Sequence, residues 1–140
     1  MPCAKPLLLV DDSLDDAMIL KRALGDLGIA RRMIHAPSAE QALAQLRSAA
    51  DERPGLILLD LNMPGMGGME FLRTIKDDPS LAQIPVVVLT TSQERRDIAK
   101  SFDLHAAGYV VKPSNYAAAV EALKIIENYW ALSYLPACHN

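Results

Sequence analysis

The stretch Leu56-Ile57-Leu58-Leu59-Asp60-Leu61-Asn62-Met63-Pro64-Gly65 decides the fold of this chain. Four aliphatic residues lead directly into one carboxylate, and Pro64 and Gly65 then turn the chain. A short apolar run bounded by turn residues is typical of a strand that is buried on both faces of a sheet. Asp60 therefore stands at the carboxyl end of a strand, where open parallel sheets bind their ligands. A single Asp in such a position is also compatible with a helix cap.

The same pattern recurs in three other parts of the chain. Each apolar run leads into polar residues, namely Leu7–Val10 into Asp11 and Asp12, Val86–Leu89 into Thr90, and Tyr109–Val111 into Lys112. Helix capping does not explain four strands that all deliver polar groups at the same end. We therefore expect these side chains to share one crevice.

Composition excludes several classes of protein. The chain has 140 residues, of which 51% are hydrophobic and 22% charged, as expected for one globular domain. It carries 14 basic and 17 acidic residues, whereas a general nucleic-acid binder needs a concentrated basic surface. No apolar stretch approaches the length of a membrane span, and the N-terminus lacks a signal-peptide core. The sequence thus predicts a cytoplasmic protein that binds neither nucleic acid nor membrane.

Strands alternate with helices along the whole chain. Strands are predicted near Pro6–Val10, Arg32–Ala36, Leu56–Leu59, Val86–Leu89 and Gly108–Val111. Helices are predicted to begin after Ser13, Ser38, Gly68, Ser92 and Ser114 or Asn115, and the last reaches about Leu132. Ser13-Leu14-Asp15-Asp16 resembles a capping box, and the helix after Ser92 carries the apolar residues Ile98 and Phe102. Five such repeats predict an α/β fold, a doubly wound parallel sheet in the order 2-1-3-4-5 with helices on both faces.

The predicted crevice has the chemistry of phosphoryl transfer. Three crowded carboxylates repel each other, and a hard cation such as Mg²⁺ relieves that repulsion. A carboxylate is also a possible nucleophile, forming an aspartyl phosphate. Lys112 and Thr90 supply the ammonium and the hydroxyl that stabilise a transferring phosphoryl group. The alternative for Lys112 is a structural salt bridge.

These motifs resemble the receiver domains of two-component response regulators. The matching residues are Asp11-Asp12, Leu58 to Pro64, Thr90 and Lys112-Pro113, in the family's order and spacing. The resemblance implies that Asp60 is the phosphoacceptor. It implies Mg²⁺, which Mn²⁺ could replace, bound by Asp12, Asp60 and the backbone carbonyl of Asn62, with Asp11 acting through water. Lys112 would contact the phosphoryl group, Thr90 would sense it, and Tyr109 matches the family's switch aromatic.

A closer resemblance links the chain to the small single-domain regulators that partner bacterial phytochromes. It rests on Ile75–Pro79, Ile84–Ser92 and the ending Tyr129-Trp130 to Leu135-Pro136. It implies one receiver domain over residues 1–140, with a core of about 6–133 and a short extension at 134–140. The partner would be a sensor histidine kinase, namely a bacteriophytochrome. The chain would be a signalling protein and not an enzyme, although it would assist its own phosphotransfer and autodephosphorylation.

Three positions depart from the family pattern. Gly67 stands where Asp or Asn is usual, which removes a cap from the following helix. Ser38-Ala39 replaces a common Asp-Gly, and His105 stands where a Gly normally ends the fourth helix. We expect strain or rearrangement at the His105 turn.

The last helix carries more apolar residues than one buried stripe requires. Trp and Tyr are enriched at the centres of interfaces. We therefore predict a symmetric homodimer through the fourth helix, fifth strand and fifth helix, with Tyr129, Trp130 and Leu135 in the interface. The alternative is that Trp130 only covers the bottom of the core.

Two other functions fit some of the same residues. Magnesium-dependent phosphohydrolases also use a nucleophilic Asp with Thr and Lys, but they place two acidic residues as Asp-x-Asp after one strand. A receiver-like module that binds partners without phosphate would not need the complete acidic set. An FMN carrier is disfavoured because no phosphate-binding loop follows the first strand.

Overall fold

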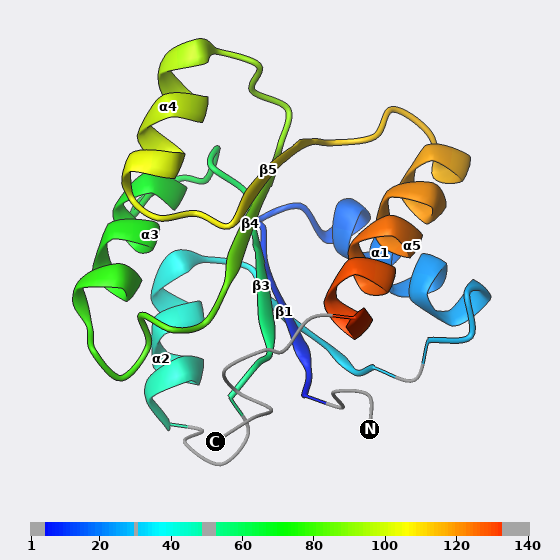
Figure 1. Cartoon of the computed structure of the whole chain (residues 1–140), viewed down its shortest axis with the longest axis horizontal. Helices are drawn as coiled ribbons and strands as arrows, with labels where there is room; N and C mark the ends of the chain where they lie inside the picture. Colours follow the sequence, from blue (N-terminus) through cyan, green and yellow to red (C-terminus); the bar gives the residue numbers. More distant parts are fainter. Residues whose placement is uncertain (1–4, 30, 49–52, 133–140) are drawn as a thin grey trace.

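A computed structural model describes residues 5–29, 31–48 and 53–132, in which five strands alternate with five helices (Figure 1). The predicted extension at residues 134–140 lies outside the described part. The strands are β1 (Leu7–Val10), β2 (Met33–Ala36), β3 (Leu56–Leu59), β4 (Val86–Thr90) and β5 (Gly108–Val111). The helices are α1 (Leu14–Asp26), α2 (Ala39–Ser48), α3 (Gly68–Asp77), α4 (Arg95–Asp103) and α5 (Tyr116–Leu132). None of the helices in the described ranges has the length and apolar character that a membrane span requires.

The sheet is parallel throughout and has the predicted order β2-β1-β3-β4-β5. Val10 of β1 pairs with Leu59 of β3, so the two strands end at the same level. At the other end of the sheet, Thr90 of β4 pairs with Val111 of β5. The residues that follow each strand therefore meet at the carboxyl ends of the strands, as the sequence predicts.

Helices cover both faces of the sheet and create two hydrophobic cores. In Figure 1, α1 and α5 lie on one side of the sheet, and α2, α3 and α4 lie on the other. Side chains alternate between these cores along β3, because Ile57 and Leu59 face the α2–α3 side while Leu56 and Leu58 face α1 and α5. The central strands are consequently buried on both faces.

Most predicted helix caps are present. The Ser13 hydroxyl accepts a hydrogen bond from the backbone N–H of Asp16 at 3.1 Å, and the Ser38 hydroxyl accepts one from Gln41 at 3.1 Å. At α5, the Asn115 carboxamide oxygen accepts from the N–H of Ala118 at 2.8 Å. Gly67 provides no side-chain cap to α3, as predicted from the departure at that position.

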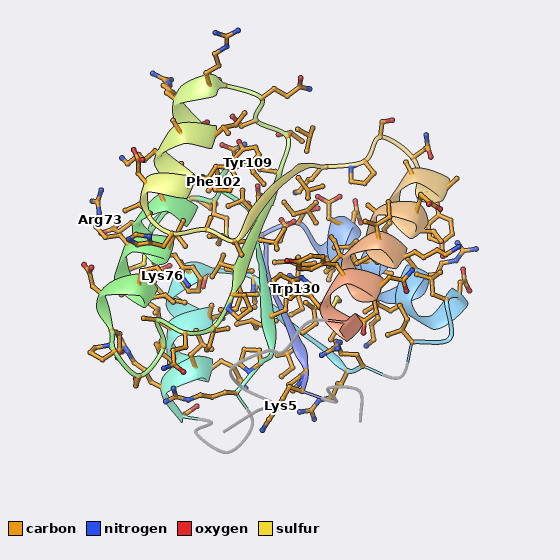
Figure 2. The ribbon with its side chains drawn as sticks, in the orientation of Figure 1. Lys5, Arg73, Lys76, Phe102, Tyr109 and Trp130 are labelled. Carbon is orange, nitrogen blue, oxygen red and sulfur yellow. The ribbon has the colours of Figure 1, made fainter. Side chains whose placement is uncertain are left out.

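The predicted start of α4 was wrong. The helix begins at Arg95 and not after Ser92, because Ser92 closes a turn in which its hydroxyl accepts from the N–H of Glu94 at 3.3 Å. Phe102, expected as an apolar position of this helix, is 47% exposed and lies on α4 in Figure 2. Ser101 is the buried residue instead, and its hydroxyl donates to the carbonyl of Asp97 at 2.7 Å.

Two helices end in the same hydrogen-bonded motif with different residues. Gly28 follows α1 with φ 68°, and its N–H donates to the carbonyl of Gly25 at 3.0 Å. His105 follows α4 with φ 68° and donates in the same way to Phe102 at 2.9 Å. Since a residue with a Cβ is strained in this left-handed conformation, the predicted strain at His105 is confirmed.

Candidate functional site

Three carboxylates meet where β1 and β3 end. Asp11, Asp12 and Asp60 each place one oxygen within 4.8 Å of the others. The backbone sets this arrangement, because the N–H of Asp60 donates to the carbonyl of Val10 at 2.9 Å. The N–H of Asp11 likewise donates to the carbonyl of Ala36 at 3.1 Å. The predicted convergence of the acidic residues is therefore a consequence of strand register.

Asp60 is 4% exposed and Asp11 is fully buried, whereas Asp12 is exposed. Burial raises the pKa of Asp60 above its usual value, and Asp11 raises it further, although the Lys112 ammonium opposes this. The site consequently disfavours the charged form of Asp60 relative to a carboxylate in water. Asp12 is the carboxylate of the three that solvent reaches most easily.

Lys112 follows β5 and reaches the buried carboxylates of Asp11 and Asp60 and the partly exposed carboxylate of Asp16. Its Nζ lies 2.9 Å from Asp11, 3.5 Å from Asp60 and 2.7 Å from Asp16. Its backbone N–H donates to the carbonyl of Thr90 at 2.7 Å, which fixes the start of the side chain. Burial disfavours the charged ammonium, but the hydrogen bond to Asp16 and the negative charges of Asp11 and Asp60 outweigh burial and raise the pKa of Lys112. The lysine therefore carries a full positive charge beside Asp60.

Asp16 belongs to this site, although the sequence identified it only as part of a helix cap. Its backbone N–H makes the predicted bond to Ser13, but its carboxylate turns to Lys112. The Ser13 N–H donates instead to Asp11 Oδ1 at 2.9 Å. The sequence did contain a signal, since Asp16 stands in the first turn of the helix that directly follows Asp11 and Asp12.

Thr90 and Asn62 border the site on the β3 and β4 sides. The Asn62 amide donates to the Thr90 hydroxyl at 3.4 Å, and the Asn62 backbone N–H donates to Asp60 Oδ1 at 3.3 Å. Thr90 is fully buried, while Asn62 is exposed. Both predicted residues therefore lie against Asp60.

Tyr109 is connected to the loop that follows Thr90. Its hydroxyl donates to the backbone carbonyl of Ser92 at 2.9 Å, and the Ser92 N–H donates to the Thr90 hydroxyl at 3.4 Å. The ring packs against the core on the α3–α4 side, near α4 in Figure 2. Two hydrogen bonds through Ser92 thus join the Thr90 hydroxyl to Tyr109, a connection that the sequence did not reveal.

The acidic cluster fits a hard divalent cation. Asp11 Oδ2 is buried, and its close partner in the described residues is Lys112 Nζ, which it meets without hydrogen-bond alignment. Oxygen atoms from several carboxylates within 4.8 Å form the donor set that Mg²⁺ and Mn²⁺ prefer. Asp12 and Asp60 would be ligands with the carbonyl of Asn62, and Asp11 would act through water.

A cavity of about 410 Å³ opens beside Lys112, between α1, α5 and the loop after β5. Its lining includes Asp16, Ile19, Pro113 and Tyr116. Lys112 is therefore accessible from this side of the molecule, and Asp16 lies at the cavity wall.

The predicted dimer residues lie at the end of α5. Tyr129 is 62% exposed, whereas Trp130 is half-buried and packs against the core between α1, α5 and the sheet (Figure 2). The two rings meet edge to face with centroids 4.8 Å apart. Leu135 lies outside the described residues.

A flavodoxin-like sheet that gathers acidic groups and a lysine at its switch point places them where open α/β sheets bind their ligands. The chain belongs to the response regulator receiver domain family, whose sequence profile matches residues 7–124. Members of this family bind Mg²⁺ at an acidic pocket and pair with histidine kinases.

Individual relatives are similar over almost the whole chain. Response regulator Rcp1 of Synechocystis sp. PCC 6803 is 38% identical over 130 residues, which cover 90% of this chain and 88% of that protein. The crystal structure of the phosphorylated cyanobacterial phytochrome response regulator RcpA has a TM-score of 0.89 at 38% identity and covers 96% of this chain and 99% of that one. The Mn²⁺-bound form of Rcp1 has a TM-score of 0.84 at 37% identity, covering 94% and 99%.

Proposed function

We propose that Asp60 accepts a phosphoryl group from the phosphohistidine of a sensor histidine kinase. The observation that carries this proposal is the position of Asp60, a buried carboxylate with Lys112 Nζ at 3.5 Å and two further carboxylates within 4.8 Å. Three crowded carboxylates, two of them buried, around one ammonium are costly, so this constellation is better explained by a reaction than by stability.

Each residue around Asp60 has a separate role in the phosphoryl transfer. Asp60 attacks phosphorus in line with the phosphohistidine nitrogen, which leaves with the bonding electron pair. Lys112 neutralises charge on the phosphoryl oxygens, and the Thr90 hydroxyl donates to one of them. A divalent cation, when bound by Asp12, Asp60 and the Asn62 carbonyl, supplies the remaining positive charge. The same groups assist the later hydrolysis of the aspartyl phosphate.

The signal leaves the site through the loop between β4 and α4. When the Thr90 hydroxyl turns to the phosphoryl group, it gives up its hydrogen bond from the Ser92 N–H. The Ser92 carbonyl holds the Tyr109 hydroxyl, so a movement of this loop changes the surface formed by α4 and β5. Phosphorylation thereby biases that surface between two states.

The kinase that we propose is a bacteriophytochrome acting in the cytoplasm. The support is the similarity to Rcp1 and to RcpA, which is described as a phytochrome response regulator. An exposed apolar strip on α1 next to the site offers a surface for the kinase, since Leu14 is 64% exposed and Met18 is 61% exposed.

Phosphotransfer from purified kinases tests both parts of this proposal. Wild type and Asp60→Asn are incubated with phosphorylated histidine kinases, with Asp77→Asn as a control that changes an exposed carboxylate on α3. We expect label on wild type and Asp77→Asn, none on Asp60→Asn, and faster transfer from a phytochrome kinase than from unrelated kinases. Undiminished labelling of Asp60→Asn would show that another residue is the acceptor.

We also propose that the chain forms a symmetric homodimer through α4, β5 and α5. Exposed apolar side chains occur on all three elements, with Phe102 at 47%, Val111 at 41%, Ile125 at 60% and Tyr129 at 62%. Trp130 would support this surface from below through its edge-to-face contact with Tyr129. Exposed apolar groups on neighbouring elements are typical of an interface between copies of a chain.

Light scattering over a concentration series tests the dimer. We expect Ile125→Glu to be monomeric at concentrations where wild type is dimeric, and Met18→Glu on α1 to remain dimeric as the matched control. A wild-type protein that stays monomeric at high micromolar concentration, with and without a phosphoryl mimic on Asp60, would refute the proposal.

A further inference from the structure

Lys112 is shared unequally among three carboxylates. Its Nζ is closest to Asp16 at 2.7 Å, next to Asp11 at 2.9 Å, and farthest from Asp60 at 3.5 Å. The shortest contact thus goes to a helix residue with no part in the transfer described above. The longest contact is with Asp60, the carboxylate that Lys112 is proposed to assist.

The two competing carboxylates differ in their freedom to move. The Asp11 side chain is 1% exposed and follows β1, so its contact with Lys112 is fixed by the sheet. The Asp16 side chain is 37% exposed, belongs to the first turn of α1 and lines the cavity beside Lys112. Because water reaches Asp16, its carboxylate is able to turn outward and be hydrated when Lys112 moves away.

We propose that Asp16 is a positioning residue that restrains Lys112 and thereby slows the acceptance of a phosphoryl group by Asp60. This inference rests on the proposed function and deepens it. Asp16 holds the ammonium toward α1, so that Lys112 must exchange one ion pair for another during the transfer. Its negative charge also repels an incoming phosphoryl donor, which is itself an anion.

The restraint acts during phosphoryl transfer to Asp60, as with the small donor acetyl phosphate. An oxygen of Asp60 forms a bond to phosphorus while the bond from phosphorus to the acetyl oxygen breaks, and acetate leaves with the electron pair. Negative charge on the phosphoryl oxygens then competes with Asp16 for Lys112. Asp16→Asn removes this competitor and retains the size of the side chain. We expect its labelling rate to be about two- to fivefold higher, the range for loss of one partly exposed ion pair.

The full-length protein is labelled with acetyl phosphate and Mg²⁺ and followed by phosphate-affinity electrophoresis. Asp15→Asn is the matched control, because Asp15 lies in the same turn of α1, is exposed, and makes no side-chain hydrogen bond or ion pair within the described part of the chain. Asp16→Glu restores a carboxylate, and Asp16→Ser is a second neutral variant. The affinity for beryllofluoride, an unreactive phosphoryl mimic, is measured by NMR titration as a readout that a purely structural role would not improve.

We expect Asp16→Asn and Asp16→Ser to be labelled faster and to bind beryllofluoride more tightly, while Asp15→Asn and Asp16→Glu stay close to wild type. Neutral variants that are no faster than Asp15→Asn would overturn the inference, as would a gain in rate without a gain in beryllofluoride affinity. Failure of the proposed function is a different result, namely a wild-type protein that takes no label or an Asp60→Asn variant that does.

Discussion

Gly68, the first residue of α3, is the position where the structure allows the sharpest test of the site's framework. A Cβ at this position would lie 2.4 Å from the carbonyl oxygen of Asp60 and 2.6 Å from Cα of Leu61. Both atoms belong to the backbone that carries Asp60, the proposed phosphoacceptor. Since carbon atoms in contact are normally about 3.5–4.0 Å apart, α3 and this loop must separate by roughly 1 Å in Gly68→Ala.

Insertion of a methyl group into a packed site costs about 1–3 kcal/mol, and the cost is highest where no flexible side chain can give way. We therefore expect Gly68→Ala to lower the free energy of unfolding by about 2–3 kcal/mol. Because the displaced loop carries Asp60 and Asn62, the rate of labelling by acetyl phosphate should fall as well. Urea denaturation with a matched labelling assay measures both effects.

Gly25→Ala is the control, because an added Cβ there meets no atom within 4 Å and the residue lies inside α1. A helical Gly replaced by Ala should raise the free energy of unfolding by about 0.5–1 kcal/mol. The two Gly→Ala changes are thus expected to have opposite signs. If Gly68→Ala were as stable as wild type, the close approach of α3 to the Asp60 backbone would not be real.

Two further predictions concern the metal and the end of α4. Asp12→Ala should weaken Mg²⁺ binding at least about tenfold in calorimetry, since even an indirect partner of a metal site contributes that much, and equal affinity in both proteins would exclude Asp12 as a ligand. His105→Gly should raise the free energy of unfolding by about 0.5–1 kcal/mol, because Gly relieves the strain at φ 68° at some cost in chain entropy. His105→Ala, which keeps the strain, should not be stabilised, and an equal gain in both variants would contradict this explanation.

Local patterns in the sequence carried much of the architecture. The apolar runs placed the strands because a strand buried on both faces needs a continuous hydrophobic segment. They also placed Asp60 at a strand end, where register with β1 brings it to Asp11. The strained turn at His105 was predictable because a helix end in this conformation normally requires Gly. Each of these conclusions depends on residues that are close in sequence or on the regular geometry of a parallel sheet.

The start of α4 could not be predicted in the same way, because the Ser92 hydroxyl is suited both to cap a helix and to close a turn. In the structure Ser92 closes a turn. Its hydroxyl donates a hydrogen bond to Asp97 at 2.6 Å, and its carbonyl accepts one from the Tyr109 hydroxyl of β5. The exposure of Phe102 could not be predicted for a related reason. Helical spacing defines a stripe on α4, but the position of the helix over the sheet determines which side of that stripe is buried.

The sequence by itself determined the parallel sheet and the set of polar groups at the carboxyl ends of its strands, because strand periodicity and chain connectivity leave few alternatives. Only the tertiary structure determined which carboxylates Lys112 contacts and at what distances. Asp16 and Lys112 are 96 residues apart, and their 2.7 Å contact exists because α1 and the end of β5 pack at the same corner. No local pattern encodes that distance, since it depends on how two separately predictable elements are positioned by the core between them.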